Sequence, residues 1–145
     1  MGTLIDTSVF IDLERAHTRR GGSDFDKVAH ELAEQIGFDE AVAMSSVTAS
    51  ELLHGVHRAK PELRARREAF VEMAIAAFPP QPFDLLAARI HAGVWADLAG
   101  RGQEIGAHDV LIAATAMSIG WRVATANTRH FERIPGLEVR TVRFG

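Results

Sequence analysis

Short apolar runs alternate with longer helical segments along this chain, and that alternation restricts its fold more than any other feature. Buried strands are predicted at 2–5, 41–44, 122–125 and 139–142. Each run is shorter than an ordinary helix, and the segments between them carry apolar residues at helical spacing. Strands that alternate with helices predict an α/β fold with a parallel sheet and helices on both faces.

The helical segments begin and end at residues typical of helix termini. Residues 17–24 are predicted to form a polar loop in which Ser23 is a candidate N-cap for the next helix. Three prolines at 79, 80 and 82 predict a short extended piece. The predicted helices cover 7–15, 25–36, 61–77 and 108–119, and two more follow the caps Ser45 or Ser46 and Asp84.

Composition limits the classes of protein to which the chain can belong. With 145 residues, 47% of them hydrophobic, it is expected to form one domain over 1–145. The absence of cysteine excludes disulfides and thiolate metal sites, so a bound metal would need oxygen or histidine ligands. No stretch has the length of a membrane span, and a cytoplasmic location is expected.

The net charge of −3 means that any binding of nucleic acid would depend on local basic patches. Two groups of arginines are candidates, although each group alone is more typical of a solvated loop or helix face. They are Arg15, Arg19 and Arg20, and Arg64, Arg66 and Arg67.

Three acids interrupt apolar stretches, and the predicted topology brings them to one edge of the sheet. Asp6 follows the first strand, Glu51 lies one turn into the helix after the second, and Asp109 opens a later helix. Asn127 comes just after the strand at 122–125. Ligands of open α/β sheets bind beyond the carboxyl ends of the strands, where all four residues are expected.

Each acid also has a purely structural interpretation, which the sequence leaves open. Asp6 would serve as a helix cap, Asp109 would complement a helix N-terminus, and Glu51 would be an ordinary surface residue. His108 is more typical of a cap or the edge of a core than of a metal ligand. Against these interpretations, three gathered carboxylates repel one another unless a cation lies among them.

Four segments together resemble PIN-domain ribonucleases of the VapC toxin type. They are DTSVFIDL with Asp6, SELLHG with Glu51, IGAHDVLIAATA with Asp109, and TANTRHF near the end. The resemblance extends over nearly the whole chain, in order. It implies a three-layer sandwich in which helices flank a short parallel sheet of four or five strands.

The resemblance further implies an endoribonuclease dependent on Mg²⁺ or Mn²⁺. Asp6 and Asp109 match the principal metal ligands, and Glu51 matches a ligand or the group that positions the attacking water. Carboxylate oxygens suit these hard cations better than they suit zinc. Ser8 and Thr125, and less strongly Thr7, are candidate hydroxyls for orienting the carboxylates or water.

Partners follow from the same resemblance. Toxins of this type are made beside a VapB-type antitoxin that blocks the acidic groove, and they commonly form homodimers. RNA is the implied substrate. Trp95 and Trp121 are expected in the core or at a dimer interface, while contact of Arg129 or His130 with RNA and an ion pair are equally compatible with the sequence.

One departure from the family favours an alternative function. Many PIN domains carry a fourth acid where this chain has Asn127, so a second metal ion would be held more weakly. The alternative is a PIN-like module that binds RNA or protein without cleavage. A receiver domain is excluded because Lys27 and Lys60, the two lysines, do not follow a late strand, and a haloacid-dehalogenase-type phosphatase because Ser8 replaces its second aspartate.

Overall fold

Five parallel strands form one sheet in the computed structural model, which describes residues 2–21 and 25–144. Their spatial order is β3-β2-β1-β4-β5, so the chain's first strand is central. This confirms the predicted parallel α/β sheet. The strands are β1 Gly2–Ile5, β2 Ala41–Ser45, β3 Pro80–Gln81, β4 Arg122–Thr125 and β5 Val139–Thr141.

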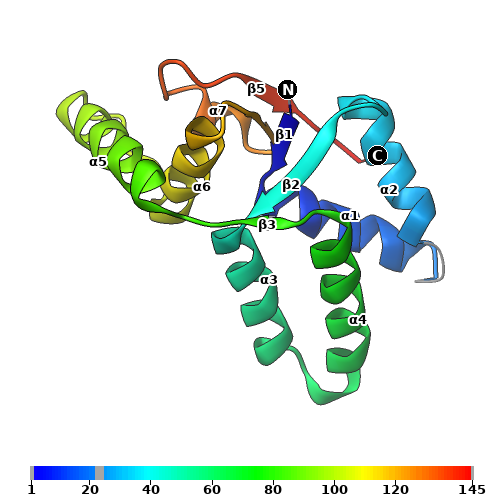
Figure 1. Ribbon diagram of the computed structural model, residues 1–145. Helices are drawn as coiled ribbons and strands as arrows, with labels where there is room; N and C mark the ends of the chain where they lie inside the picture. The colour runs from blue at the N-terminus through cyan, green and yellow to red at the C-terminus, as the bar shows by residue number, and fades with distance from the viewer. Residues whose placement is uncertain (1, 22–24, 145) are drawn as a thin grey trace.

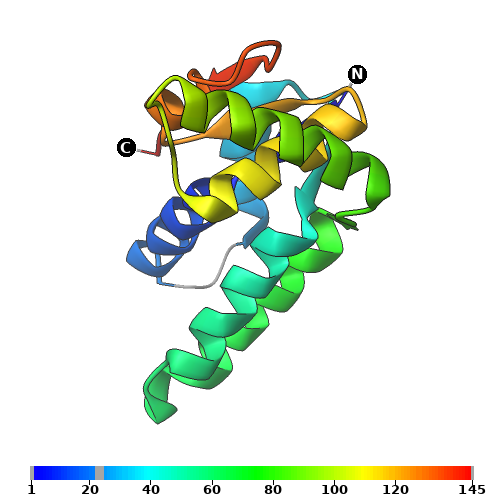
Figure 2. The ribbon, with the colours of Figure 1, turned by 90° about the vertical axis from the view of Figure 1, so that its left-hand side faces the viewer.

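Helices cover both faces of the sheet (Figure 1). Four of them lie toward one face, and α5, α6 and α7 lie toward the other. The helices α3 and α4 form a hairpin that projects from the body of the molecule (Figure 2). The helices are α1 Thr7–Arg19, α2 Phe25–Ile36, α3 Ser46–Arg58, α4 Pro61–Ala77, α5 Leu85–Gly100, α6 Ala107–Ser118 and α7 Thr128–Phe131.

Two apolar clusters, one on each face, hold the layers together. Successive residues of a strand point to opposite faces, so Leu4 packs beneath α6 while Ile5 packs beneath α1. Ala43 and Met44 of β2 divide in the same way. The three-layer sandwich therefore follows from central strands that bury apolar residues on both faces rather than on one.

Most helix termini lie close to where the sequence predicted them. Ser45 and Asp84 cap their helices by accepting hydrogen bonds from backbone N–H groups at 3.0 and 2.9 Å. The predicted loop was wrong at 17–19, because α1 continues to Arg19. His17 is buried against aromatic rings of α2 and α4, and this packing extends the helix. The short α7 was not predicted, and Ser23 lies outside the described residues.

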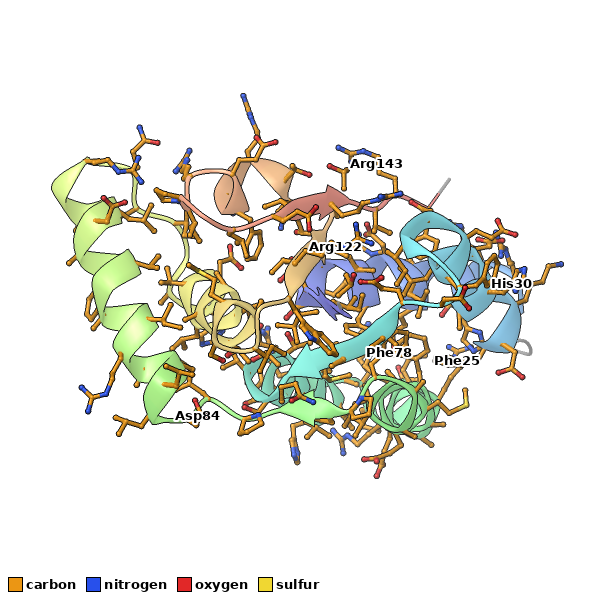
Figure 3. The ribbon with its side chains drawn as sticks, turned by 45° about the horizontal axis from the view of Figure 1, so that its top comes forward. Phe25, His30, Phe78, Asp84, Arg122 and Arg143 are labelled. Atoms are coloured by element: carbon orange, nitrogen blue, oxygen red, sulfur yellow. The ribbon has the colours of Figure 1, made fainter. Side chains whose placement is uncertain are left out.

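Arg122 joins the amino end of the sheet to α2, at the edge opposite the acids (Figure 3). Its guanidinium donates to the Thr3 hydroxyl at 2.8 Å and to the Ile36 carbonyl at 2.9 Å. The Thr3 hydroxyl in turn donates to Glu40 at 2.9 Å. These contacts satisfy polar groups at one end of the sheet and leave the carboxyl end free for function.

Gly2 is required by Trp121, whose half-buried indole packs on the second apolar cluster. A Cβ at position 2 would overlap this ring. We expect Gly2→Ala to lower the free energy of unfolding in urea by about 1–3 kcal/mol, the usual cost of overpacking. Gly93→Ala is the control, because open space surrounds this helical glycine and alanine should stabilise by up to about 1 kcal/mol. Equal urea midpoints for Gly2→Ala and the wild type would contradict this account of the indole.

Candidate active site

Asp6 occupies the carboxyl end of the central strand and is buried, with 2% of its surface exposed. Its Oδ2 accepts hydrogen bonds from the hydroxyls of Ser8 at 2.6 Å and Thr125 at 2.8 Å. Although Asp6 is the residue before α1, its side chain does not cap that helix. The simple helix-cap interpretation is therefore not supported, and the carboxylate is oriented toward β4 instead.

Both hydroxyls are fixed by the backbone that follows β4. Ser8 Oγ accepts from the N–H of Ala126 at 3.0 Å, and Thr125 Oγ1 accepts from the N–H of Asn127 at 2.9 Å. With its acceptor side occupied, each hydroxyl directs its proton to Asp6. The position of Asp6 thus depends on contacts between two segments more than 110 residues apart in sequence.

Among residues 2–21 and 25–144, no basic side chain forms an ion pair or hydrogen bond with the Asp6 carboxylate. Burial raises the pKa of Asp6 above its ordinary value, and the negative charge of Asp109 raises it further. The hydrogen bonds from Ser8 and Thr125 lower the pKa and offset part of this effect. A buried carboxylate beside a second acid favours binding of a proton or a metal ion.

Glu51 reaches the same edge from α3 and is held by contacts with α1 and α6. The Thr7 hydroxyl donates to its Oε1 at 2.7 Å, and His108 Nδ1 lies 3.3 Å from its Oε2. Thr48, one turn before Glu51, lies 3.0 Å from Thr7 through the two hydroxyl oxygens. Sequence reasoning missed Thr48, although its i,i+3 spacing to Glu51 places both on one helix face.

Asp109 lies in the first turn of α6 and faces a histidine. Its Oδ2 is 3.1 Å from Nδ1 of His130, a residue of α7. His108 and His130 thus each contact one of the two outer carboxylates, and for His130 this is the ion pair that the sequence left open. Neither imidazole forms an ion pair or hydrogen bond with Asp6, whose carboxylate is bound by Ser8 and Thr125.

Asn127 lies at the same end of the sheet but is exposed. Its backbone N–H contributes to the network around Thr125, whereas its side-chain amide has no hydrogen bond within the described ranges 2–21 and 25–144. The structure thus brings Asp6 close to Asp109 and ties Thr7 to Glu51. It leaves the Asn127 amide outside these contacts.

The chemistry of these side chains fits a hard divalent cation that keeps much of its hydration shell. Over the part of the chain that the structure describes, no three acidic or histidine side chains converge into a closed metal cage. Structural zinc sites need such a cage. Mg²⁺ usually binds through one or two carboxylates plus waters and phosphate, so it does not require such a cage.

Comparisons with known proteins identify the family of this chain. The family model described as PIN domain matches residues 3–137. The chain is 34% identical to Ribonuclease VapC of Rickettsia bellii over 144 residues, covering 98% of this chain and 97% of the relative. It is 40% identical over 100 residues to the tRNA(fMet)-specific endonuclease VapC of Salmonella typhimurium, covering 68% and 73%.

A solved structure extends the similarity to three dimensions. VapBC-5 from Mycobacterium tuberculosis, a member of the VapBC family of toxin-antitoxin systems, superposes with a TM-score of 0.71. The two chains are 30% identical, and the match covers 99% of this chain and 98% of that one. The protein therefore belongs to the PIN-domain family, among its VapC members. None of the described helices is long and apolar enough to cross a membrane.

The raised pKa of Asp6 gives a prediction for stability. The pKa of Asp6 is higher in the folded state than in the unfolded state. Its favourable contribution to the free energy of unfolding is therefore complete below the unfolded-state pKa and is lost as pH rises through the folded-state pKa. At pH 7 the ionised carboxylate therefore destabilises the metal-free fold. We expect Asp6→Asn to raise the free energy of unfolding in EDTA at pH 7 by on the order of 1 kcal/mol, with the gain shrinking toward pH 4.

Thermal melts of both proteins across this pH range measure the effect. Asp39→Asn, which removes an exposed carboxylate, is the matched control and should leave the melting temperature nearly unchanged. A lower melting temperature for Asp6→Asn than for the wild type at pH 7 would contradict the assigned environment.

Proposed function

We propose that this protein is a metal-dependent endoribonuclease that hydrolyses phosphodiester bonds of RNA at the edge formed by Asp6, Glu51 and Asp109. The observation that carries the proposal is the buried Asp6 carboxylate, which two hydroxyls orient and whose pKa the charge of Asp109 raises. A purely structural role would favour a neutral residue there. The printed names of the relatives, ribonuclease and endonuclease, support the same reaction.

Asp6 and Asp109 would hold Mg²⁺ or Mn²⁺ directly or through water. When bound, such a cation supplies Lewis acidity at the scissile phosphate and lowers the pKa of water toward that of a usable nucleophile. Ser8 and Thr125 fix the direction of the Asp6 carboxylate. Supporting hydrogen bonds of this kind commonly set metal affinity.

Glu51 has a second role in this proposal. Thr7 holds one carboxylate oxygen, and the other faces His108, so Glu51 is anchored at the rim of the site. From there it would position the attacking water or complete the metal's ligand set. Thr7 and Thr48 are then positioning residues that act through Glu51.

Asn127 bears on the number of metal ions. Its exposed amide retains an oxygen donor but carries no charge. We therefore favour one resident metal ion, with a second recruited only together with RNA phosphate.

The competing function is a PIN-like module that binds RNA or protein without cleavage, and the missing fourth acid is the observation that favours it. The buried Asp6 carboxylate, oriented by Ser8 and Thr125, argues against that alternative.

A partner antitoxin is the second part of the proposal. The Mycobacterium tuberculosis neighbour belongs to a toxin-antitoxin system, and its match to nearly the whole of this chain supports a VapB-type antitoxin here. RNA as substrate implies that both partners act in the cytoplasm. Inhibition would require the antitoxin to cover the acidic edge, where a basic side chain would supply the missing counter-charge.

Cleavage of total RNA by the purified protein tests the activity. With Mg²⁺ or Mn²⁺ we expect discrete cuts, whose end mapping identifies the RNA, and no cuts in EDTA. Asp6→Asn should reduce the rate at least about 100-fold, and Ser8→Ala, which removes one orienting hydroxyl, about 10- to 100-fold. Ser46→Ala, an exposed serine on α3, is the control for Ser8→Ala. Folded, metal-binding protein that leaves every RNA intact would favour the binding module.

We also propose a homodimer, for which α5 supplies the apolar surface. Leu85 and Trp95 are 66% and 58% exposed, more than Ile11 on α1, which is 42% exposed. Exposed apolar groups of this size are typical of interfaces. Leu85→Lys combined with Trp95→Ser should convert a dimer to a monomer in light scattering, whereas Phe38→Ser, which removes an exposed ring on the loop before β2, should not.

A further inference from the structure

Positive charge is concentrated at residues 54–67, where the hairpin of α3 and α4 turns. Between residues 54 and 67 there are five basic side chains and one acidic one, Glu62, so this segment carries +4 while the rest of the chain carries −7. Such asymmetry in an acidic protein is typical of a surface that meets a polyanion. The basic residues are Arg58, Lys60, Arg64, Arg66 and Arg67.

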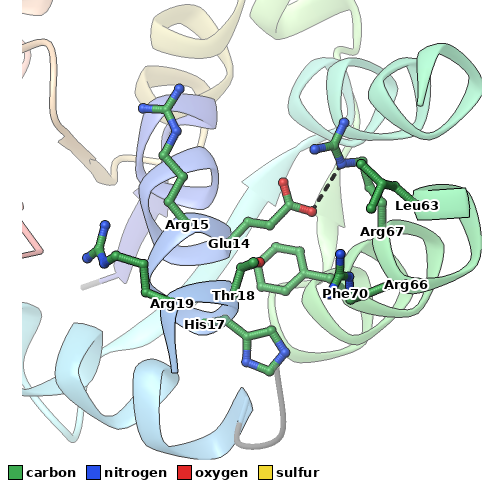
Figure 4. A pocket seen from close by; sticks show the side chains of 9 residues that line it. All are labelled: Glu14, Arg15, His17, Thr18, Arg19, Leu63, Arg66, Arg67 and Phe70. Atoms are coloured by element: carbon green, nitrogen blue, oxygen red, sulfur yellow. Dashed lines mark hydrogen bonds and ion pairs between the residues drawn. The ribbon is translucent and has the colours of Figure 1, made fainter. Parts of the chain in front are cut away.

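A cavity of about 410 Å³ lies between this hairpin and the end of α1 (Figure 4). Arg15 and Arg19 line it from α1, and Arg66 and Arg67 line it from α4. Glu14 is the one acid in the lining, and it pairs with Arg67 at 3.3 Å. These four arginines define what we call the arginine pocket.

Two of the four arginines have little to neutralise them. Arg66 is exposed and makes no hydrogen bond or ion pair with any residue of the described ranges. Arg15 is 71% exposed at its side chain, and Asp12 approaches it only to 3.9 Å. Guanidinium groups in this state are suited to bidentate binding of phosphate oxygens.

The arginine pocket is continuous with the candidate active site. A second cavity, of about 670 Å³, runs between α1 and the hairpin. Its lining includes Thr7, Glu51 and His108 at the acidic edge, and Arg15 and Arg67, which also line the arginine pocket. One groove therefore leads from Glu51, at the rim of the acidic edge, to the arginines.

The distance between the acidic edge and the arginines suits an RNA strand that extends beyond the scissile bond. Arg15 and Arg19 lie eight and twelve residues after Thr7 along α1, or about 12 and 18 Å at the helical rise of 1.5 Å per residue. A few nucleotides of RNA span this distance. The acids at one end repel a polyanion in the absence of metal, so substrate affinity must come from cations elsewhere.

We propose that the arginine pocket binds the backbone phosphates of the RNA strand, a few nucleotides from the bond that is cut at Asp6. This inference rests on the proposed RNA substrate and adds where the strand is held. Several arginines spaced along a groove match a ligand with one charge per nucleotide, whereas an acidic peptide would need its few carboxylates at matching intervals. Contacts of this kind position RNA without selecting its sequence.

Binding of a labelled, mixed-sequence single-stranded RNA, measured by fluorescence anisotropy in EDTA, tests the inference. All proteins carry Asp6→Asn, so that cleavage does not interfere. Arg15→Gln with Arg66→Gln should weaken binding roughly 25-fold at 0.1 M salt and reduce the slope of log affinity against log salt by about 1.4, the value for two phosphate contacts on a single strand.

The matched control is the double substitution Arg89→Gln with Arg143→Gln, which removes the same charge from exposed positions on α5 and after β5. It should reduce affinity and salt slope much less than the pocket variant does. Circular dichroism melts verify that both double variants are folded. Equal affinities for the two variants, or no RNA binding by the Asp6→Asn parent, would overturn the proposal.

The outcome for the pocket is separable from the outcome for the proposed function. If the wild type cuts RNA but the two double variants bind RNA equally, the endoribonuclease stands and the pocket is refuted. If the wild type never cuts RNA but the pocket variant alone loses affinity, the pocket stands on a binding module. The pocket variant could also keep its full RNA affinity but no longer retain a co-expressed antitoxin. This result would assign the arginines to that partner and overturn the proposal.

Discussion

The hydrogen bonds from Ser8 and Thr125 to Asp6 are the interaction on which the remainder of the site depends. They connect the central strand, the first turn of α1 and the end of β4, which meet only when the parallel sheet has formed. The network therefore requires β1 to be paired with β4. A metal ion that binds Asp6 would stabilise this folded state.

Two adjacent residues of α1 donate hydrogen bonds to two different carboxylates. Ser8 directs its hydroxyl to Asp6, while Thr7 directs its own to Glu51 on α3. The first turn of α1 thus sets the positions of two carboxylates that belong to different elements. A change in the position of this turn would move both acids together, which explains how a site assembled from four segments keeps its geometry without a closed metal cage.

The sequence predicted the sheet, most helix termini and the edge at which the acids gather, because strand length, apolar periodicity and caps are local signals. It failed where tertiary contacts decide. Burial of His17 against Phe25 and Phe70 extends α1 beyond its polar sequence. The pairing of His108 with Glu51 and of His130 with Asp109 depends on how three helices meet, which no spacing within one segment records.

The two edge strands of the sheet affect how the protein behaves when no partner is bound. β3 is two residues long and contains Pro80, which has no N–H to offer a further strand, with Pro79 and Pro82 on either side. β5, at the other edge, is three residues long with the charged Arg140 at its centre. Short, proline-flanked and charged edges resist pairing with other chains. A molecule released from its partner at high local concentration would therefore avoid aggregation by sheet extension.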